Sequence, residues 1–134
     1  MNNFDLKKNI VITGASRGIG LATVKHLLST GHRVFGLSRS EMDPELRSFS
    51  SKQPGELHWH TTGTDLALVS KAIAGVLPDN EQLDGLIHNA GLLINKPFSE
   101  TSEDDWLMQF EANVFMVFRW TRGLESLMGH GSHI

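Results

Sequence analysis

The sequence predicts an α/β fold in which a parallel sheet carries helices on both of its faces. Two observations lead to this prediction. Short apolar runs alternate along the 134 residues with stretches in which apolar residues recur at helical spacing. Neither a linker nor an internal repeat divides the chain, so we treat residues 1–134 as one domain. Right-handed crossovers between successive strands then give the strand order 3-2-1-4.

The first apolar run, residues 9–12, leads through a glycine-rich turn into an amphipathic helix that begins near Gly18. Small residues suit a turn where the backbone approaches a phosphate and the helix packs closely on the strand. The helix start offers unpaired N–H groups to an anion. From the glycines alone, a flexible helix entry is the alternative. The candidate phosphate-binding residues are Gly14, Ser16, Arg17, Gly18, Ile19 and Gly20.

The middle of the chain continues the alternation. Strands are predicted over residues 33–37 and 57–61, and the irregular stretch between them contains a short helix over 44–49. A helix over 66–77 follows, and Asp65 stands where a side chain caps a helix start. The next apolar run, at 86–87, is followed directly by His88, which we interpret as a hydrogen-bonded core histidine.

Four motifs follow the predicted strands in order. They are the turn with the spacing TGxxxGxG, Ser38-Arg39, Thr64-Asp65-Leu66 and Asn89-Ala90-Gly91. Together they resemble the short-chain dehydrogenase/reductase family, whose members bind NAD or NADP. The resemblance runs from about residue 8 to residue 134 and implies a Rossmann-like doubly wound sheet with the dinucleotide beside the glycine turn.

The resemblance also implies a choice of cofactor. Ser38 stands where NAD-selective members carry an acidic residue, and Arg39 follows it. Arg17 supplies a second cation near the same ribose in members that prefer NADP. Either arginine alone could be a solvated surface charge. Together, with no acid at Ser38, they favour NADP(H) over NAD(H).

The remaining two motifs resemble parts of the family site that contact the adenine and the nicotinamide ribose. Asp65, with the backbone of Leu66, corresponds to the adenine contact, which is compatible with helix capping. Asn89, Ala90 and Gly91 correspond to the family's NNAG element, in which small residues let the ribose approach the backbone.

A long helix is predicted over residues 103–128, with Thr101 or Ser102 as its cap. Apolar residues nearly encircle it, so it is deeply buried or shared between chains. The resemblance implies a homo-oligomer formed through this helix, and the residues expected to be shielded include Trp106, Phe110, Phe115 and Trp120. Asn113 matches the family's helix Asn, an accessory position in a proton relay. A mid-helix Asn that makes a local hydrogen bond is the alternative.

The sequence departs from the family in its catalytic residues. Family members use a Ser and a Tyr-x-x-x-Lys pair downstream of the strand that would begin near residue 131, and this chain contains no tyrosine. We therefore expect a fold truncated at the start of its fifth strand, with residues 86–87 left as an unpaired edge. The expected function is the NADP(H)-binding portion of a dehydrogenase or reductase that acts on a carbonyl or alcohol substrate.

Two alternatives stay open. The chain could be a catalytically silent nucleotide-binding or assembly module. It could also be a half-enzyme that a partner chain completes with the missing strands and the Tyr and Lys.

Composition excludes several other classes. The net charge of −3 without a basic cluster argues against a nucleic-acid partner. His58 and His60 alternate along one strand without cysteine or carboxylate partners, so no metal site is expected. The polar start, the lack of a long apolar run and the absence of cysteine predict a cytoplasmic protein without a membrane segment.

Overall fold

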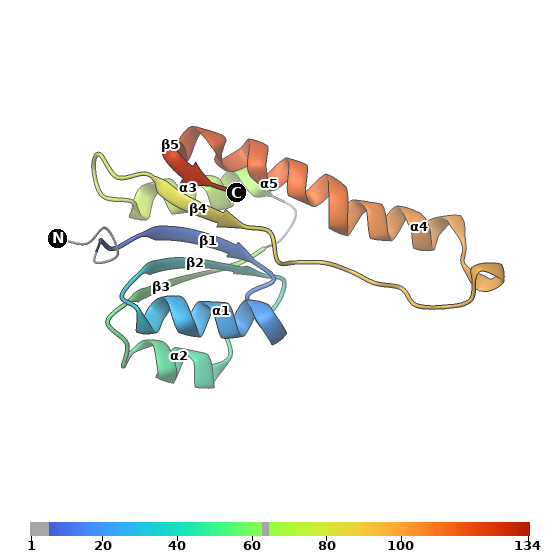
Figure 1. Ribbon diagram of the computed structural model, residues 1–134, viewed down its shortest axis with the longest axis horizontal. Helices are drawn as coiled ribbons and strands as arrows, with labels where there is room; N and C mark the ends of the chain where they lie inside the picture. The colour runs from blue at the N-terminus through green and yellow to red at the C-terminus, as the bar shows by residue number, and fades with distance from the viewer. Residues whose placement is uncertain (1–5, 63–64) are drawn as a thin grey trace.

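A computed structural model of the chain describes residues 6–62 and 65–134. Five strands form one parallel sheet in the order β3-β2-β1-β4-β5, and helices lie on both of its faces (Figure 1). The predicted fold class and the order of the first four strands are confirmed. The elements are β1 (Asn9–Thr13), α1 (Gly18–Ser29), β2 (Arg33–Ser38), α2 (Pro44–Ser50), β3 (Glu56–Thr61), α3 (Leu66–Val76), β4 (Leu83–Ile87), η1 (Phe98–Glu100), α4 (Glu103–Phe110), η2 (Glu111–Phe115), α5 (Met116–Leu124), η3 (Glu125–Leu127) and β5 (Met128–His133).

The sheet separates two apolar layers. On one face, Phe35 and Leu37 of β2 pack with buried residues of α3 and α5. On the other face, Val34 packs with buried residues of α1 and α2. This alternation follows from the two-residue period of a strand, and it explains why β2 is buried along its whole length.

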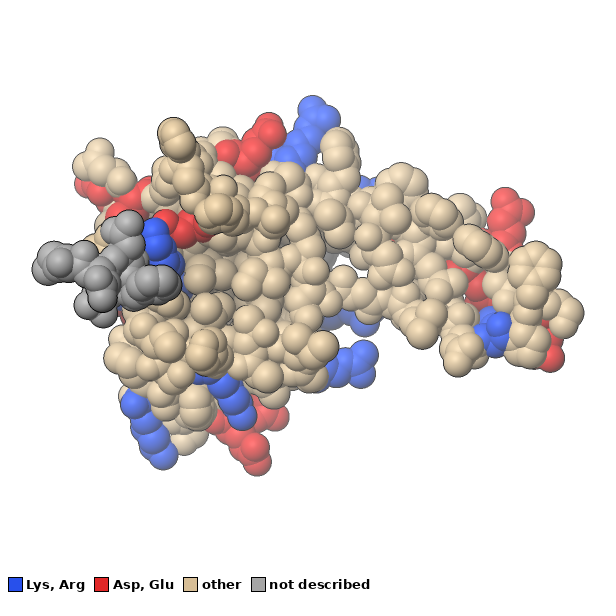
Figure 2. All heavy atoms as spheres, in the orientation of Figure 1, with Lys and Arg blue, Asp and Glu red and all other residues tan. Residues whose placement is uncertain are grey.

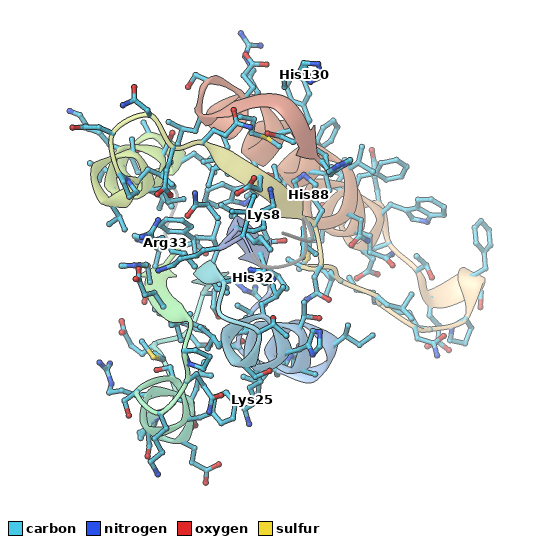
Figure 3. The ribbon with its side chains drawn as sticks, turned by 60° about the vertical axis from the view of Figure 1, so that its left-hand side comes forward. Lys8, Lys25, His32, Arg33, His88 and His130 are labelled. Carbon is cyan, nitrogen blue, oxygen red and sulfur yellow. The ribbon has the colours of Figure 1, made fainter. Side chains whose placement is uncertain are left out.

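A polar network joins the amino ends of the strands, at the end of the sheet opposite the glycine turn (Figure 3). The guanidinium of Arg33, whose side chain is only 10% exposed, donates to Glu56 (2.9 Å) and Glu81 (3.0 Å). It also donates to the Asn9 side chain (2.8 Å). Asp84 accepts from the Asn9 backbone N–H (2.8 Å). Four successive strands are thus tied together.

Glu56 makes this network sensitive to acid. Its hydrogen bonds from Lys7 and Arg33 lower the pKa of the carboxyl from 4.5 to about 2. A depressed folded-state pKa stabilises the fold fully above pH 4.5, and that contribution is lost as the pH falls toward about 2. Because Glu56 is 46% exposed, solvent screening reduces its contribution.

We therefore expect Glu56→Gln to lower the free energy of unfolding at pH 7 by about 1 kcal/mol. The variant should also flatten the acid dependence of stability between about pH 2 and 4.5. Urea unfolding at pH 7 and pH 3 measures both effects. Glu41→Gln, an exposed carboxylate in the connection after β2, is the matched control. Equal acid sensitivity of both variants and the parent protein would contradict this assignment.

The long C-terminal helix differs from its prediction. Helical structure runs from Glu103 through Leu127, but it changes to π-helix over η2 and tightens to a 3₁₀ turn at η3. The strand then begins at Met128, three residues earlier than expected. Contacts with β4 explain this, because the Ser132 hydroxyl donates to the Leu83 carbonyl (2.6 Å). Tertiary pairing therefore overrides the helical pattern.

The fifth strand pairs with the first half of β4, where Leu83 aligns with Met128 and Gly85 with His133. The fifth strand, of which only the start was expected, is thus six residues long. Leu86 and Ile87 lie past the aligned positions, so the expected open edge is confined to the end of β4.

The apolar residues of the helical stretch 103–127 are divided between core and surface. Trp120 is 5% exposed and Leu124 is fully buried, whereas Trp106, Phe110 and Phe115 are 45–49% exposed. The prediction that Trp120 needs a partner chain to be shielded is wrong, because α5 packs it against the sheet. Figure 1 shows α4 extending past the sheet. Across the part of the chain that the structure describes, no helix combines the length and hydropathy that a membrane crossing requires.

Candidate functional site

The predicted site residues meet at the carboxyl edge of the sheet. Parallel strands place their carboxyl ends on one edge, and in this sheet Thr13 aligns with Leu37 while Ile12 aligns with Ile87. The glycine turn therefore lies beside the loop after β2 and the Asn89-Ala90-Gly91 segment. Asp65 and Leu66 lie at the start of α3, after the neighbouring strand β3. Thr64 of the third motif lies outside the described residues.

Thr13 and Asn89 fasten the ends of β1 and β4 to each other. The Thr13 hydroxyl accepts from the backbone N–H groups of Asn89 (3.2 Å) and Ala90 (3.1 Å). The Asn89 amide donates to the carbonyls of Thr13 (3.2 Å) and Gly14 (3.1 Å). This role of Thr13 was not predicted. Its only signal in the sequence is a polar residue directly after the apolar residues 10–12.

The three glycines of the turn differ in what surrounds the position of an added Cβ atom. At Gly14 (φ +68°), an added Cβ would lie 2.8 Å from Ala90 Cα, and at Gly20 it would lie 2.1 Å from the Gly14 carbonyl oxygen. These two positions are small because protein backbone occupies the space. Gly18 (φ +56°) is different, since no atom of the described residues lies within 4 Å of the Cβ position. Gly18 therefore borders open space in front of α1.

The N-terminus of α1 suits an anion. Its N-cap residue, Arg17, is extended (φ −156°), makes no side-chain capping bond, and no acidic residue stands in the first turn. Ile19 is 80% exposed. A twelve-residue helix with uncapped N–H groups and a positive dipole end favours negative charge. The geometry at Gly18 and the uncapped helix start together fit a bound pyrophosphate.

The loop after β2 presents a cation. Ser38 is 6% exposed, and its hydroxyl accepts from the Ser40 backbone N–H (3.1 Å). Arg39 and Arg17 are both exposed. Among the described residues, no carboxylate forms a salt bridge with either guanidinium. Both side chains can therefore turn toward a ligand at this edge.

Asp65 caps α3 as predicted. Its carboxylate accepts from the backbone N–H groups of Ala67 (3.0 Å) and Leu68 (3.2 Å). These bonds satisfy two free donors of the first turn. Its contact with an adenine stays a prediction.

Three polar side chains of the long helical stretch hold the extended segment that follows β4. They are spaced four residues apart and contact alternate residues of that segment. The pairs are Asn113 with the Leu92 backbone (2.7 and 2.8 Å), Gln109 with the Ile94 backbone (3.1 Å), and Asp105 with Lys96 (2.5 Å). Four helical residues rise about 6 Å and two extended residues about 6.6 Å, so the spacings match.

Asn113 lies in the middle of the π-helical segment η2. A Cβ at Gly91 would stand 3.1 Å from its Oδ1 atom, so this glycine lets the amide approach the segment. The side chain bonds the backbone of Leu92, 21 residues away, so the local hydrogen bond that was the alternative is not what it makes. Its relay role stays a prediction. Beside it, a hollow of about 380 Å³ lies between the extended segment and α4, lined in part by Lys96, Trp106 and Phe110.

His88 is hydrogen-bonded, as predicted, but it is half-buried and not a core residue (Figure 3). Its Nε2 atom lies 2.9 Å from the Thr121 hydroxyl of α5, and burial lowers its pKa. His58 and His60 stack on the Phe35 ring, with centroids 5.3 and 6.4 Å away. Within residues 6–62 and 65–134, no group of three or more His, Asp or Glu side chains is placed to hold a metal ion.

The family model for short chain dehydrogenase matches residues 8–133. The chain belongs to the short-chain dehydrogenase family. Cyclopentanol dehydrogenase of Comamonas sp. (strain NCIMB 9872) is 33% identical over 122 residues, which cover 87% of this chain and 48% of that protein. Carbonyl reductase (NADPH) 2 of Sus scrofa is 33% identical over 109 residues, covering 81% of this chain and 42% of that protein.

Solved structures share the fold. The crystal structure of Cj0485 dehydrogenase has a TM-score of 0.78 at 25% identity, covering 95% of this chain and 49% of that one. The NADH-dependent reductase A1-R′ complexed with NAD has a TM-score of 0.75 at 23% identity, covering 90% and 52%. This short-chain dehydrogenase chain thus spans about half the length of its relatives. The family binds nicotinamide dinucleotides and small-molecule substrates.

Proposed function

We propose that this chain binds NADP(H) at the carboxyl edge of its sheet, as the cofactor-binding part of an oxidoreductase for a carbonyl or alcohol substrate. The observation that carries this proposal is the open space at Gly18 in front of the uncapped N-terminus of α1. An anion there would receive backbone N–H groups and the positive end of the helix dipole.

The proposal gives each group of residues a binding role. The start of α1 would hold the pyrophosphate, Arg17 and Arg39 the 2′-phosphate, and Asp65 with the Leu66 backbone the adenine. The segment from Asn89 to Gly91 would lie against the nicotinamide ribose. The cofactor, when bound, supplies the hydride that is exchanged with the substrate.

The NADP(H) preference is supported by Arg17 and Arg39, which form no salt bridge with the residues that the structure describes, and by the lack of an acid at Ser38. The names of similar proteins point both ways, since the Sus scrofa relative carries NADPH in its name and the reductase A1-R′ is NADH-dependent. The proposed NADP(H) preference therefore rests on the side chains of Arg17, Ser38 and Arg39 and not on the names of similar proteins.

In this proposal the 134 residues bind the cofactor and do not themselves transfer the proton. The 134 residues include no tyrosine, and the side chain of Asn113 is bonded to the Leu92 backbone. A hydride transfer to a carbonyl needs a proton donor at the oxygen. The proton donor would come from chain segments or a partner outside these residues.

Nucleotide binding and turnover test this proposal in one sample. We expect the 134-residue chain to enhance NADPH fluorescence saturably, and to reduce no carbonyl compound above the solution rate. Failure to bind either NADPH or NADH would refute the function. Robust reductase activity would show that another residue, such as His88, donates the proton.

We also propose that the helical stretch 103–127 joins two copies of the chain. Seven of its large apolar side chains are 45–60% exposed, namely Trp106, Leu107, Met108, Phe110, Val114, Phe115 and Phe118. Figure 2 shows the charged side chains of this region mainly at its outer end, with an uncharged area next to them. Apolar surface of this kind favours association.

Light scattering after size exclusion measures the assembly, and we expect a dimer or larger species. Phe118→Glu, which puts a charge on the most exposed of these side chains (60%), should shift the protein toward monomer without unfolding it. A parent protein that is monomeric at micromolar concentration would contradict this interface.

A further inference from the structure

The loop that presents Arg39 is held on both sides of that residue. The Ser38 hydroxyl accepts from the Ser40 backbone N–H (3.1 Å), and the Trp59 indole N–H donates to the Ser40 carbonyl (3.1 Å). Both polar groups of the Ser40 backbone are therefore engaged by side chains. Arg39 lies between a buried residue and this fixed one.

Trp59 reaches the loop because β2 makes room for its ring. It stands on β3 opposite Gly36 of β2, and a Cβ on Gly36 would lie only 2.9 Å from the indole. The ring packs in the apolar layer on the α1 side of the sheet, where Ala15 of the glycine turn also lies. The indole thus connects the middle of β3 to the loop after β2.

We call the two hydrogen bonds that Ser38 and Trp59 make with the Ser40 backbone the brace. The brace matters because Arg39 is exposed. A guanidinium on a free loop loses both backbone and side-chain freedom when it binds a phosphate. Where the flanking backbone is already fixed, only the side chain has to be ordered. Preorganisation therefore strengthens the contact with the 2′-phosphate and leaves contacts elsewhere on the dinucleotide unchanged.

We propose that Trp59 and Ser38 are positioning residues that fix Arg39 for the 2′-phosphate and so strengthen the preference for NADP(H) over NAD(H). The inference rests on the proposed function. It gives Ser38 an internal role, as the acceptor that shapes the loop, in addition to its position beside the ribose. It also gives Trp59 a role that no motif indicates.

The variants Trp59→Phe and Ser38→Ala test the brace, because each removes one of the two hydrogen bonds and keeps most of the packing. Isothermal titration of the 134-residue chain with NADPH and with NADH gives both affinities. We expect each variant to weaken NADPH binding about 3- to 10-fold, as for one lost hydrogen bond, and to lower the ratio of NADPH to NADH affinity. Trp59→Phe, which changes no proposed cofactor contact, should weaken NADH binding less than about 2-fold.

Two controls isolate the mechanism. Trp106→Phe makes the same chemical change in α4, outside the proposed cofactor site, and should leave both affinities unchanged. In an Arg39→Ala background, Trp59→Phe should no longer alter the ratio of NADPH to NADH affinity, because the residue that it positions is absent.

The outcomes separate this inference from the proposed function. Binding of neither nucleotide by the parent chain refutes the proposed function, and this inference with it. Normal NADPH binding with an unchanged affinity ratio in both variants overturns the inference alone. Equal weakening of NADPH and NADH also overturns it, since that pattern indicates a general structural role. If Trp59→Phe is unfolded by circular dichroism, the milder Ser38→Ala decides.

Discussion

Replacing Arg39 with aspartate is expected to reverse the cofactor preference of this chain. Arg39 is exposed at the end of β2, and neither it nor Arg17 has a salt bridge among the described residues. A well-formed charge-assisted bond to the 2′-phosphate contributes about 1.5–3 kcal/mol, less where solvent screens it. The parent chain should therefore bind NADPH more tightly than NADH.

In Arg39→Asp, NADPH binding should weaken about 10- to 100-fold, because attraction to the 2′-phosphate becomes repulsion. NADH binding should hold or improve, since an acid near this position can accept from the ribose hydroxyls. Cofactor fluorescence titration measures both constants. Arg122→Asp, the same charge change on α5, is the control. Equal NADPH and NADH affinities in the parent chain would reject the roles of Arg17 and Arg39.

Local patterns predicted much of this fold because each depends on few distant contacts. The glycine turn, the apolar runs and the Asp65 cap are each written within about ten residues, and β1, α1 and α3 form where they were expected. The right-handed crossover rule then supplied the strand order without any pairing information. The location of the candidate site follows from parallel pairing, because parallel strands place their carboxyl ends at one edge of the sheet.

Features that depend on tertiary contact were not predictable in this way. The helix ends at η3 because β5 pairs with β4. No sequence pattern in residues 125–133 predicts this pairing. The contacts that Thr13 makes with Asn89 join residues far apart in the sequence. The brace on Arg39 likewise needs Trp59, which the sequence presents only as one more strand residue.

The structure gives a different reason for the small residue at Gly14 from the one that the sequence suggests. The sequence suggests that it is small so that a phosphate can approach. The structure places Ala90 Cα 2.8 Å from its would-be Cβ, so a side chain there displaces the strand-end contacts first. Loss of binding in a Gly14 variant therefore cannot by itself indicate a phosphate contact.

Gly18→Val is expected to remove nucleotide binding while leaving the protein folded. Within residues 6–62 and 65–134, nothing lies within 4 Å of the Cβ position, so the new side chain clashes with none of these residues. The left-handed backbone (φ +56°) costs about 1–2 kcal/mol for a residue other than glycine. The branched side chain enters the space in front of α1, where the pyrophosphate would lie. Affinity for NADPH should fall about 100-fold, as for two lost charge-assisted hydrogen bonds.

Two other glycines provide matched comparisons. Gly31 also has a left-handed backbone (φ +88°) and open surroundings, but it lies between α1 and β2, at the other end of the helix. Gly31→Val should therefore carry similar strain and still bind NADPH normally. Gly20→Ala should instead lower stability by about 3 kcal/mol through overpacking, because its Cβ would lie 2.1 Å from the Gly14 carbonyl oxygen.

Thermal unfolding and NADPH titration of these three variants separate strain, packing and ligand contact. The phosphate role requires that Gly18→Val and Gly31→Val melt at similar temperatures while only Gly18→Val loses affinity. If Gly18→Val keeps near-parent affinity, the pyrophosphate does not lie at the start of α1. If both variants lose affinity equally, backbone strain in α1 accounts for the loss, and the open space at Gly18 holds no ligand.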